Sequence, residues 1–253
     1  MEVKAEKVNP YSGDKRNKSS QVREMFNNIA PAYDVMNRMM TFGGIDRLWR
    51  RKAIREVADA SPAEVLDIAT GTADLAIEIA RNVPGAKVTG IDLSEGMIEI
   101  GRQKVARHGL GDRIVLEIAD CLALPFGDNS FDCATVAFGV RNFEHLTEGY
   151  REILRTLRPG GTLFVLELST PDSPVVRPLY DLYAGYVIPA VGRLVSKDVS
   201  AYSYLQKSIA AVPKGKDMTA LMEQAGFTGT SFRKMTFGTC TLYTGKKRRT
   251  FPT

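Results

Sequence analysis

Cysteine is scarce in this chain of 253 residues, which has three: Cys121, Cys133 and Cys240. Their number is odd and no C-x-x-C pair occurs, so the sequence favours neither a disulfide framework nor a thiolate metal site. We therefore expect a cytoplasmic protein that holds no metal.

Long apolar runs are also missing. The longest one, residues 182–194, is interrupted by Gly185, Pro189, Gly192 and Arg193, and it is shorter than the roughly 20 residues that a membrane-spanning helix needs. The N-terminal residues are polar and mixed in charge, without the apolar centre of a signal peptide. The sequence predicts neither a transmembrane helix nor a secretory leader.

Net charge is small away from the two ends of the chain. The whole sequence carries +5, from 34 Lys and Arg against 29 Asp and Glu. Residues 1–24 contribute +2 and residues 246–249 contribute +4, which leaves the body at −1. Basic ends on a near-neutral body favour solvated tails, with weak attraction to an anionic membrane or to RNA as the alternatives.

Strand and helix patterns alternate from residue 64 onward. Short runs typical of buried strands are separated by stretches with helical spacing, which indicates a mostly parallel sheet with helices on both faces. Two further alternating segments, joined by Gly238 and Thr239, predict a hairpin with one strand antiparallel to the sheet. The pattern is that of a Rossmann-like α/β fold with seven strands, at residues 65–69, 87–91, 113–118, 132–137, 162–167, 230–237 and 240–246.

The polar composition of residues 1–20 predicts a flexible N-terminal segment, followed by one domain of residues 21–253. Apolar residues at helical spacing predict helices within residues 21–60, ahead of the first strand. Residues 172–210 form an insertion rich in Tyr, Val and Leu. Helices there would cover the carboxyl edge of the sheet, where doubly wound folds bind ligands.

The turn after the first strand carries a chemical signal. Gly71 follows that strand, and Asp92 ends the next strand, 21 residues later. Glycine in such a turn lets a ligand approach the backbone, and a carboxylate at the end of the next strand can accept both hydroxyls of a ribose. The pattern predicts a nucleoside cofactor.

Charge indicates which nucleoside cofactor this is. The dinucleotide fingerprint requires glycine at positions 69, 71 and 74, where this chain has Ala69, Gly71 and Asp74. A carboxylate at a helix start repels a pyrophosphate. S-adenosylmethionine has no phosphate and a net positive charge, so Asp67 and Asp74 favour it. The alternative for Asp74 is a simple helix cap or dipole partner.

Polar groups also follow the third and fourth strands. Asp120 and Cys121 come after the third strand, where Asp120 can accept a hydrogen bond from an adenine amino group or serve as an ordinary turn residue. Arg141 and Asn142 come after the fourth strand. Their apolar surroundings suit the orientation of a substrate oxygen better than a surface ion pair.

Three motifs together resemble one known family. Residues 33–37 read Tyr-Asp-Val-Met-Asn, with Trp49-Arg50 downstream, and residues 138–142 read Phe-Gly-Val-Arg-Asn. Residues 155–161 end in Pro-Gly-Gly and lead to Leu166-Glu167. From about Phe26 to the C-terminus, the chain is similar to the ubiquinone/menaquinone biosynthesis C-methyltransferases.

The resemblance implies a class I S-adenosylmethionine-dependent methyltransferase fold and a polyprenylated quinol substrate that lacks one ring methyl group. It also implies which residues contact the cofactor. These would be Thr72, Asp92, Asp120 and Cys121, beside the Gly71 and Asp67 identified above.

The chemistry of such a substrate sets the catalytic tasks. A quinone ring is too electron-poor to attack a sulfonium, whereas a quinol deprotonated at one hydroxyl pushes charge onto the ortho carbon. The enzyme must help to remove a phenolic proton and hold that carbon in line with the S-methyl bond. We expect Arg141 and Asn142 to hold the oxygens and Tyr33 or Asp74 to relay the proton. His145 is more typical of a helix cap or a surface residue.

A prenyl tail needs an apolar channel, for which the insertion offers Tyr180, Leu182, Tyr183, Tyr186, Val187, Ile188 and Val191. A helix pair that covers the core is an equally good interpretation. We expect no nucleic-acid partner, and a peripheral contact with the inner face of the membrane that the basic ends assist. A homodimer is left open. The competing functions are methylation of another small molecule or of RNA.

Overall fold

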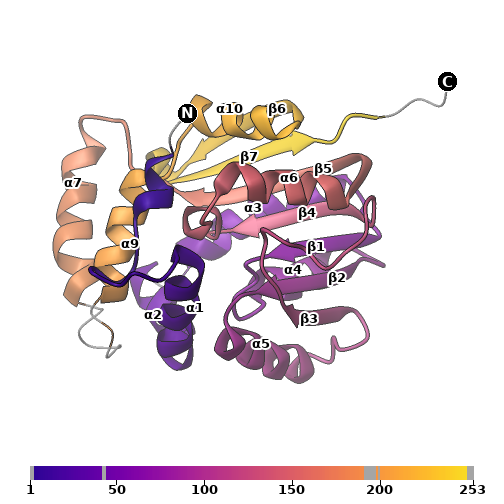
Figure 1. Cartoon of the computed structure of the whole chain (residues 1–253), viewed down its shortest axis with the longest axis horizontal. Coiled ribbons are helices and arrows are strands. Elements are labelled where there is room, and N and C mark those ends of the chain that lie inside the picture. The colour runs from indigo at the N-terminus through magenta and orange to yellow at the C-terminus, as the bar shows by residue number, and fades with distance from the viewer. Residues whose placement is uncertain (1–2, 42–43, 191–197, 199, 250–253) are drawn as a thin grey trace.

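A seven-stranded sheet forms the centre of the computed structural model, which describes residues 3–41, 44–190, 198 and 200–249. The strand order is β3-β2-β1-β4-β5-β7-β6 (Figure 1). The strands are β1 Glu64–Ile68, β2 Lys87–Asp92, β3 Ile114–Ile118, β4 Phe131–Ala137, β5 Leu157–Leu168, β6 Thr228–Met235 and β7 Cys240–Lys246. β1 to β5 are parallel to one another, and β7 is antiparallel to β5 and β6. The predicted sheet and its C-terminal hairpin are confirmed.

A helical layer covers each face of the sheet. One layer consists of α3 (Ile45–Asp59), α4 (Asp74–Asn82) and α5 (Glu95–Arg107). The other consists of α6 (Leu146–Thr156) and α10 (Lys216–Ala225). Successive side chains of a strand point to opposite faces of the sheet. In β1, Val65 packs in the apolar cluster under α3, α4 and α5, and Leu66 packs in the cluster under α6 and α10. The buried runs of the sequence therefore supply both layers.

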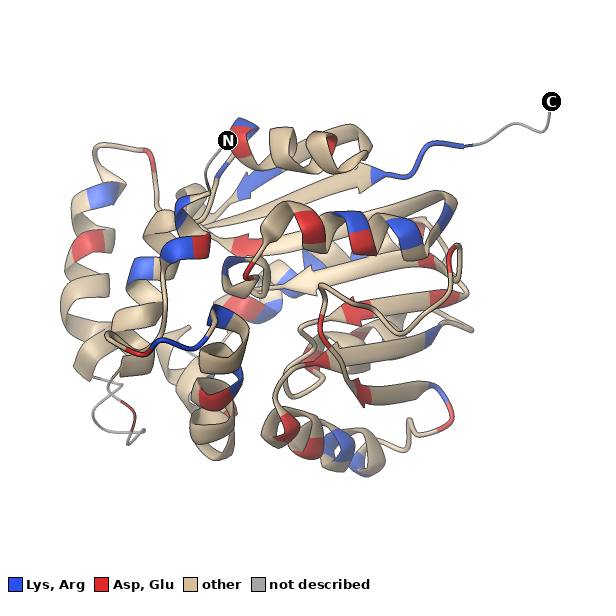
Figure 2. Cartoon of the chain, viewed as in Figure 1, with Lys and Arg blue, Asp and Glu red and all other residues tan. Residues whose placement is uncertain are grey.

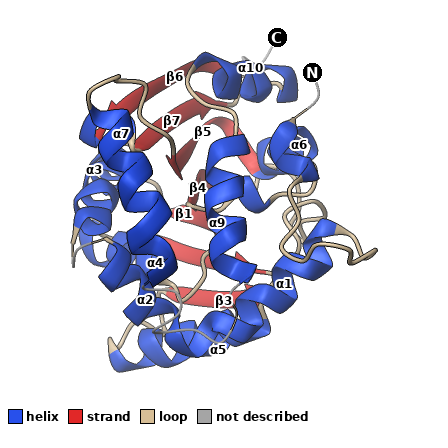
Figure 3. Cartoon of the chain, turned by 90° about the vertical axis from the view of Figure 1, so that its left-hand side faces the viewer, coloured by secondary structure: helices blue, strands red, loops and turns tan. Residues whose placement is uncertain are grey.

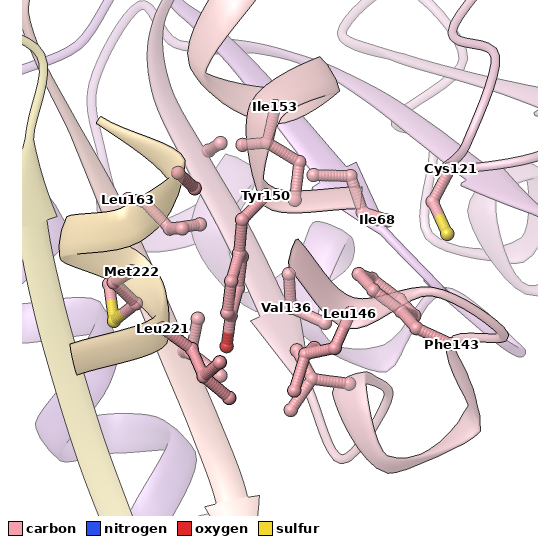
Figure 4. Close-up of a cluster of buried hydrophobic side chains, with 14 of the residues drawn as sticks. Ile68, Cys121, Val136, Phe143, Leu146, Tyr150, Ile153, Leu163, Leu221 and Met222 are labelled. Atoms are coloured by element: carbon pink, nitrogen blue, oxygen red, sulfur yellow. The ribbon is translucent and has the colours of Figure 1, made fainter. Parts of the chain in front are cut away.

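Tyr150 of α6 lies in the middle of the core on the second face (Figure 4). It is fully buried, and its hydroxyl lies 3.1 Å from the sulfur of Met218 in α10. Phe143 and Leu146 extend the same cluster to the turn that follows β4. This turn, which contains two of the predicted catalytic residues, is therefore anchored in the core.

Helices from two distant parts of the chain gather at the carboxyl ends of the parallel strands (Figures 1 and 3). They are α1 (Lys18–Ile29), α2 (Tyr33–Met40), α7 (Val176–Leu182), the π-helical segment Tyr183–Val187 and α9 (Ser200–Ala211). We call these five segments the helical cap. All of them except α7 contribute to a third apolar cluster or pack against it, with Val22, Met36, Tyr183 and Tyr204 among the residues involved. Within the described ranges, every helix is too short or too polar to cross a bilayer.

The N-terminal segment differs from the flexible one expected for residues 1–20. A short 3-10 helix, Lys4–Lys7, follows Val3, and the side chains of Val3 and Ala5 are buried in the main core. Asn17 caps α1, because its side chain accepts a hydrogen bond from the Ser20 N–H. Polar composition indicated a loose segment, but two apolar side chains and the buried Lys18 hold residues 3–18 against the body of the protein.

Candidate functional site

The carboxyl ends of the strands and the helical cap enclose two adjoining cavities. The first lies over the ends of β1, β2 and β4 and beside α1. The second extends from the same edge into the helical cap and has a volume of about 880 Å³. The residues that line both are Tyr33, Ala69, Gly71, Ala137 and Phe138. The two cavities therefore meet beside α2, at the ends of β1 and β4.

Backbone geometry opens the turn after β1 toward the first cavity. Gly71 has a φ of 56°, in the left-handed region that glycine adopts freely. A Cβ on Gly71 would meet no atom within 4 Å, so the missing side chain leaves open space beside the backbone. The Gly71 N–H donates to Asp92 Oδ2 at 2.9 Å. Two residues that the sequence links only by spacing are thus in direct contact.

Asp92 presents its carboxylate to the first cavity. Oδ2 accepts from Gly71 and Oδ1 accepts from the Ser94 N–H, each at 2.9 Å. Burial raises the pKa of Asp92, while these backbone N–H groups lower it. Each oxygen retains a further acceptor site, so the carboxylate can take two ligand hydroxyls.

Asp120 and Cys121 line the same cavity. Asp120 Oδ1 accepts from the Leu122 N–H at 2.9 Å, and its carboxylate can accept further donors. Burial raises the pKa of the Cys121 thiol well above its usual value, so the thiol is neutral. Met97 and Ala119 line the cavity beside them, so apolar side chains for a base and an acceptor for its amino group lie together.

Asp67 differs from its predicted role. The sequence suggested that its carboxylate would attract the positive charge of the cofactor. In the structure, Oδ1 accepts from the Thr135 hydroxyl and Oδ2 from the Thr70 hydroxyl, each at 2.6 Å. Burial raises the pKa of Asp67 to about 6. Although Asp67 borders the second cavity, its bonds connect β1 to β4 and to the turn after β1.

Thr72 also has a bonded side chain, which lies by the second cavity rather than the first. Its hydroxyl donates to Asp34 Oδ1 at 2.7 Å. Lys104 of α5 donates to Asp34 Oδ2 at 2.9 Å and to the Thr72 hydroxyl at 3.0 Å. These bonds connect the turn after β1 to α2, the helix that carries Tyr33.

Asp74 is ion-paired with two cations, Lys104 and Arg50. Burial alone would raise the pKa of Asp74, but the two cations hold it below its usual value. A carboxylate kept ionised in this way is a weak base, and its charge is largely neutralised. The geometry therefore argues against Asp74 as the proton relay and against its attraction of a sulfonium.

Arg141 is 6% exposed and lines the second cavity. Its Nη1 donates to Glu167 Oε1 at 2.9 Å and to the carbonyl of Phe138. Among the described residues, no group accepts from its Nε. The ion pair with Glu167 holds the guanidinium at the cavity wall, where it can meet a substrate oxygen.

Tyr33 lies at the boundary between the cavities, and Asn142 lies on the side of the first one. Tyr33 lines both cavities, and Asn142 lines the first. Burial raises the pKa of Tyr33, so its hydroxyl stays protonated and can donate a hydrogen bond. Asn142 Oδ1 accepts from the Tyr204 hydroxyl of α9 at 3.0 Å. The structure thus gathers Arg141, Asn142 and Tyr33, three of the four predicted catalytic residues.

The second cavity has a mainly apolar wall. It includes most of the residues predicted for a tail channel, namely Tyr180, Leu182, Tyr183, Tyr186, Val187 and Ile188. Val191 lies outside the described residues. Leu179, Leu182 and Tyr186 line the cavity and yet are 69%, 57% and 72% exposed. They must therefore lie at its mouth.

His145 lines neither cavity. His145 is exposed and begins α6 without a side-chain cap bond. In the part of the chain that the structure describes, no three His, Cys, Asp or Glu side chains are placed to hold a metal.

Sequence reasoning missed several polar residues of the site. Asp34, Lys104 and Glu167 had no assigned role, and Arg50 was named only as part of a family motif. The one signal available was the spacing of Asp46 and Arg50, four residues apart on α3, which predicts the ion pair that they form.

Comparisons with known proteins agree with this geometry. The family model described as the ubiE/COQ5 methyltransferase family matches residues 14–247. A demethylmenaquinone methyltransferase of Bacteroides fragilis is 47% identical over 247 residues, which cover 98% of this chain and all of that protein. The ubiquinone/menaquinone biosynthesis C-methyltransferase UbiE of Geobacter sulfurreducens is 45% identical over 231 residues, 91% of this chain and 90% of the relative.

Solved structures are similar in fold alone. The [4+2]-cyclase SpnF has a TM-score of 0.66 at 18% identity, covering 92% of this chain and 97% of its own. The S-adenosylmethionine-dependent methyltransferase SibL has a TM-score of 0.59 at 20% identity, covering 85% and 62%. At such identities, similarity of the fold says nothing about the substrate.

Proposed function

The chain belongs to the ubiE/COQ5 methyltransferase family, and from that premise we propose that it methylates a ring carbon of a polyprenylated demethylquinol. It is an S-adenosylmethionine-dependent C-methyltransferase of quinone biosynthesis. The main support for the proposed substrate is the apolar cavity of about 880 Å³, which joins the cofactor cavity beside Tyr33 and contains the buried Arg141.

The first cavity fits S-adenosylmethionine by the chemistry of its donors and acceptors. Asp92 has acceptor sites for the two ribose hydroxyls, and Asp120 has one for the adenine amino group. Gly71 leaves open space where the ligand must pass close to the backbone. When bound, S-adenosylmethionine supplies an electrophilic methyl group on a positively charged sulfur.

The second cavity supplies the groups that activate a quinol. Arg141 lies at its wall and favours the ionised form of a phenolic hydroxyl that it contacts, which lowers the pKa of that hydroxyl. Tyr33 keeps its own proton and can donate a hydrogen bond to the same oxygen or to its neighbour. Charge on the oxygen then increases electron density at the ortho carbon, which must lie at the boundary of the cavities to reach the methyl group.

The direct test is methyl transfer from labelled S-adenosylmethionine to a demethylnaphthoquinone, with and without a reductant. We expect label on the ring carbon only when the reductant is present, because only the quinol is nucleophilic. A benzoquinone analogue in parallel measures the preference for the ring. Label on an oxygen, or in added RNA and not in the quinol, would contradict the proposal.

We further propose that the mouth of the second cavity faces the membrane that holds the substrate. Leu179, Leu182 and Tyr186 are exposed there, and Val175, which precedes the lining residue Val176, is 84% exposed. The basic residues 246–249 begin at the end of β7 and lie at the opposite end of the molecule from α7 (Figure 2). Contact through the mouth of the cavity therefore does not use the C-terminal tail.

Flotation with anionic liposomes at low salt tests this orientation. We expect Leu179→Glu with Leu182→Glu to abolish flotation, because charges on an apolar contact oppose burial in the interface. Arg248→Ala with Arg249→Ala is the matched control and should still float. If the arginine variant fails to float and the leucine variant floats, the contact lies at the tail instead. Sedimentation of the same proteins without liposomes tests for a homodimer.

A further inference from the structure

Lys18, at the start of α1, is an unusual lysine because it is only 3% exposed. Its Nζ donates to three backbone carbonyls, those of Ala5 at 2.7 Å, Arg141 at 2.9 Å and Phe143 at 3.1 Å. Burial lowers the pKa of Lys18 to about 8, so at neutral pH the ammonium still carries the three protons that these bonds require. All three of its donors are used.

Two of these carbonyls flank Asn142 in the turn after β4. The turn begins at Phe138, whose φ of 58° is unfavourable for a bulky residue. It continues through Gly139, where a Cβ would lie 2.6 Å from the Cβ of Ala69. Since this conformation is not one that the turn favours by itself, contacts from outside must hold it.

Further bonds connect the N-terminal segment to the same turn. The Ser19 N–H donates to Glu144 Oε2 at 3.1 Å. Glu6 Oε1 accepts from the Leu146 N–H, at the start of α6, at 2.8 Å. Lys18 is the central contact of this set, since its one side chain bonds both the segment and the turn.

The other half of α1 is bonded to the second turn of the cofactor cavity. Asn27 Oδ1 accepts from the Ser94 hydroxyl at 2.6 Å and from the Gly96 N–H at 3.0 Å. Helix α1 thus connects the turn that follows Asp92 with the turn that carries Arg141. Its own side chains Val22 and Phe26 line the cavity between them.

We propose that Lys18 is a positioning residue for methyl transfer, which acts by holding the backbone on both sides of Asn142 so that Arg141 stays at the wall of the second cavity and Asn142 at the wall of the first. This inference rests on the proposed function. A buried ammonium is costly to desolvate, and here it donates to backbone carbonyls, two of them in the turn that carries Arg141, rather than to a carboxylate. Lys18 touches neither substrate nor cofactor, so its effect is exerted through the turn.

Substitution of Lys18 by methionine keeps the apolar stem and removes the three donors. We expect Lys18→Met to lower kcat at saturating substrates by roughly 10- to 100-fold, because small displacements of catalytic groups have effects of this size. The dissociation constant of S-adenosylmethionine should change by less than about threefold, since Asp92 is held by other bonds. Lys18→Arg, which retains charge and donors, should recover part of kcat. Lys52→Met, at an exposed position of α3, is the control.

Hydrogen exchange gives a readout that needs no substrate. Amides of residues 138–146 should exchange faster in Lys18→Met than in the unmodified protein, while those of β1 and β2 stay unchanged.

If the unmodified enzyme methylates no quinol, the proposed function fails but this comparison still tests the contact. Unchanged kcat with unchanged exchange would overturn the inference. So would a parallel fall of kcat, cofactor affinity and melting temperature that arginine does not reverse. If Lys18→Met cannot be purified folded, Lys18→Arg becomes the test. A lowered kcat with faster exchange confined to residues 138–146 supports the inference, whereas an unchanged kcat or uniformly faster exchange contradicts it.

Discussion

On the cofactor side of the site, backbone N–H groups of Gly71, Ser94 and Leu122 hold the carboxylates of Asp92 and Asp120. On the substrate side, the polar groups are held by side chains from distant elements, as Arg141 is by Glu167. The sheet itself positions the backbone N–H groups at the ends of its strands. The side-chain partners are positioned by the way the helices pack over the sheet. The two sides should therefore respond differently to substitution.

Charge differs between the two sides as well. Among the described residues, Asp92 and Asp120 form no ion pair, so their charge is available to a ligand. The cations near the substrate cavity, Arg50 and Arg141, are each paired with a carboxylate. The cofactor side can thus receive a cation. The substrate side can stabilise an anion only through guanidinium N–H groups that are not already bonded to a carboxylate.

The largest effect is expected on the substrate side, for Arg141→Ala. It should lower kcat by about 10²–10³-fold through loss of the group that favours the phenolate. It should also lower the free energy of unfolding by about 3–5 kcal/mol, because Glu167 becomes a buried charge without its partner. Urea unfolding and steady-state kinetics measure the two effects.

The double variant Arg141→Ala/Glu167→Gln separates them. It should recover most of the lost stability and none of the lost activity. Recovery of activity in the double variant would show that Arg141 acts only as a counter-ion for Glu167.

The second-largest effect is expected on the cofactor side, where a substitution should weaken cofactor binding. Asp92→Asn should weaken S-adenosylmethionine binding by about 10- to 100-fold, since hydrogen bonds to a charged group contribute about 1.5–3 kcal/mol. Calorimetry measures the affinity directly. Leu182→Ser, in the substrate cavity, should leave that affinity unchanged. Equal weakening by both variants would mean that the two sides do not bind independently.

Asp67, which connects β1 to β4, should make stability depend on pH. Burial raises its pKa from 3.8 to about 6. Between these values the folded protein binds more protons than the unfolded chain, so stability falls as pH rises. Two pKa units correspond to about 3 kcal/mol.

Substitution isolates this contribution of Asp67. Relative to the unmodified protein, Asp67→Asn should gain about 2 to 2.5 kcal/mol in the free energy of unfolding between pH 4 and pH 7. Urea unfolding at the two pH values provides the measurement, with Asp59→Asn, at an exposed position, as the control. A difference that does not vary with pH would show that Asp67 does not titrate in this range.

The smallest effects test the proton relay. Tyr33→Phe should lower kcat by roughly tenfold, through loss of one hydrogen bond to the reacting oxygen. Asp74→Asn should change kcat less, because Asp74 is already paired with Arg50 and Lys104. Neither variant should move the pH profile of kcat. A profile shifted in either variant would identify that residue as the base.

The cofactor side could be predicted from the sequence to a large extent. Gly71 and Asp92 were identified because the carboxyl ends of neighbouring parallel strands meet at one edge of a sheet. The side-chain bonds of Thr72 and Asp67 were not, because Thr72 bonds to Asp34, 38 residues away, and Asp67 to Thr135, 68 residues away. Spacing along the chain carries no information about such partners.

Lys18 is the clearest case of a residue that the sequence could not reveal. Lysines are rarely buried, and this one lies in a polar segment predicted to be loose. Its acceptor at Arg141 is a backbone carbonyl 123 residues away, and any residue type supplies a carbonyl. Composition therefore indicated a solvated tail, where the folded chain has a buried ammonium.

The sequence by itself determined the alternation of strands and helices, the glycine turn and the carboxylates that follow the strands, because these depend on side-chain periodicity and on backbone conformation over a few residues. Only the tertiary structure decided which charges are paired, where the two cavities meet and which helices enclose them. Those features arise where segments far apart in the chain pack together, and the free energy of such packing depends on shape and burial that no local pattern contains.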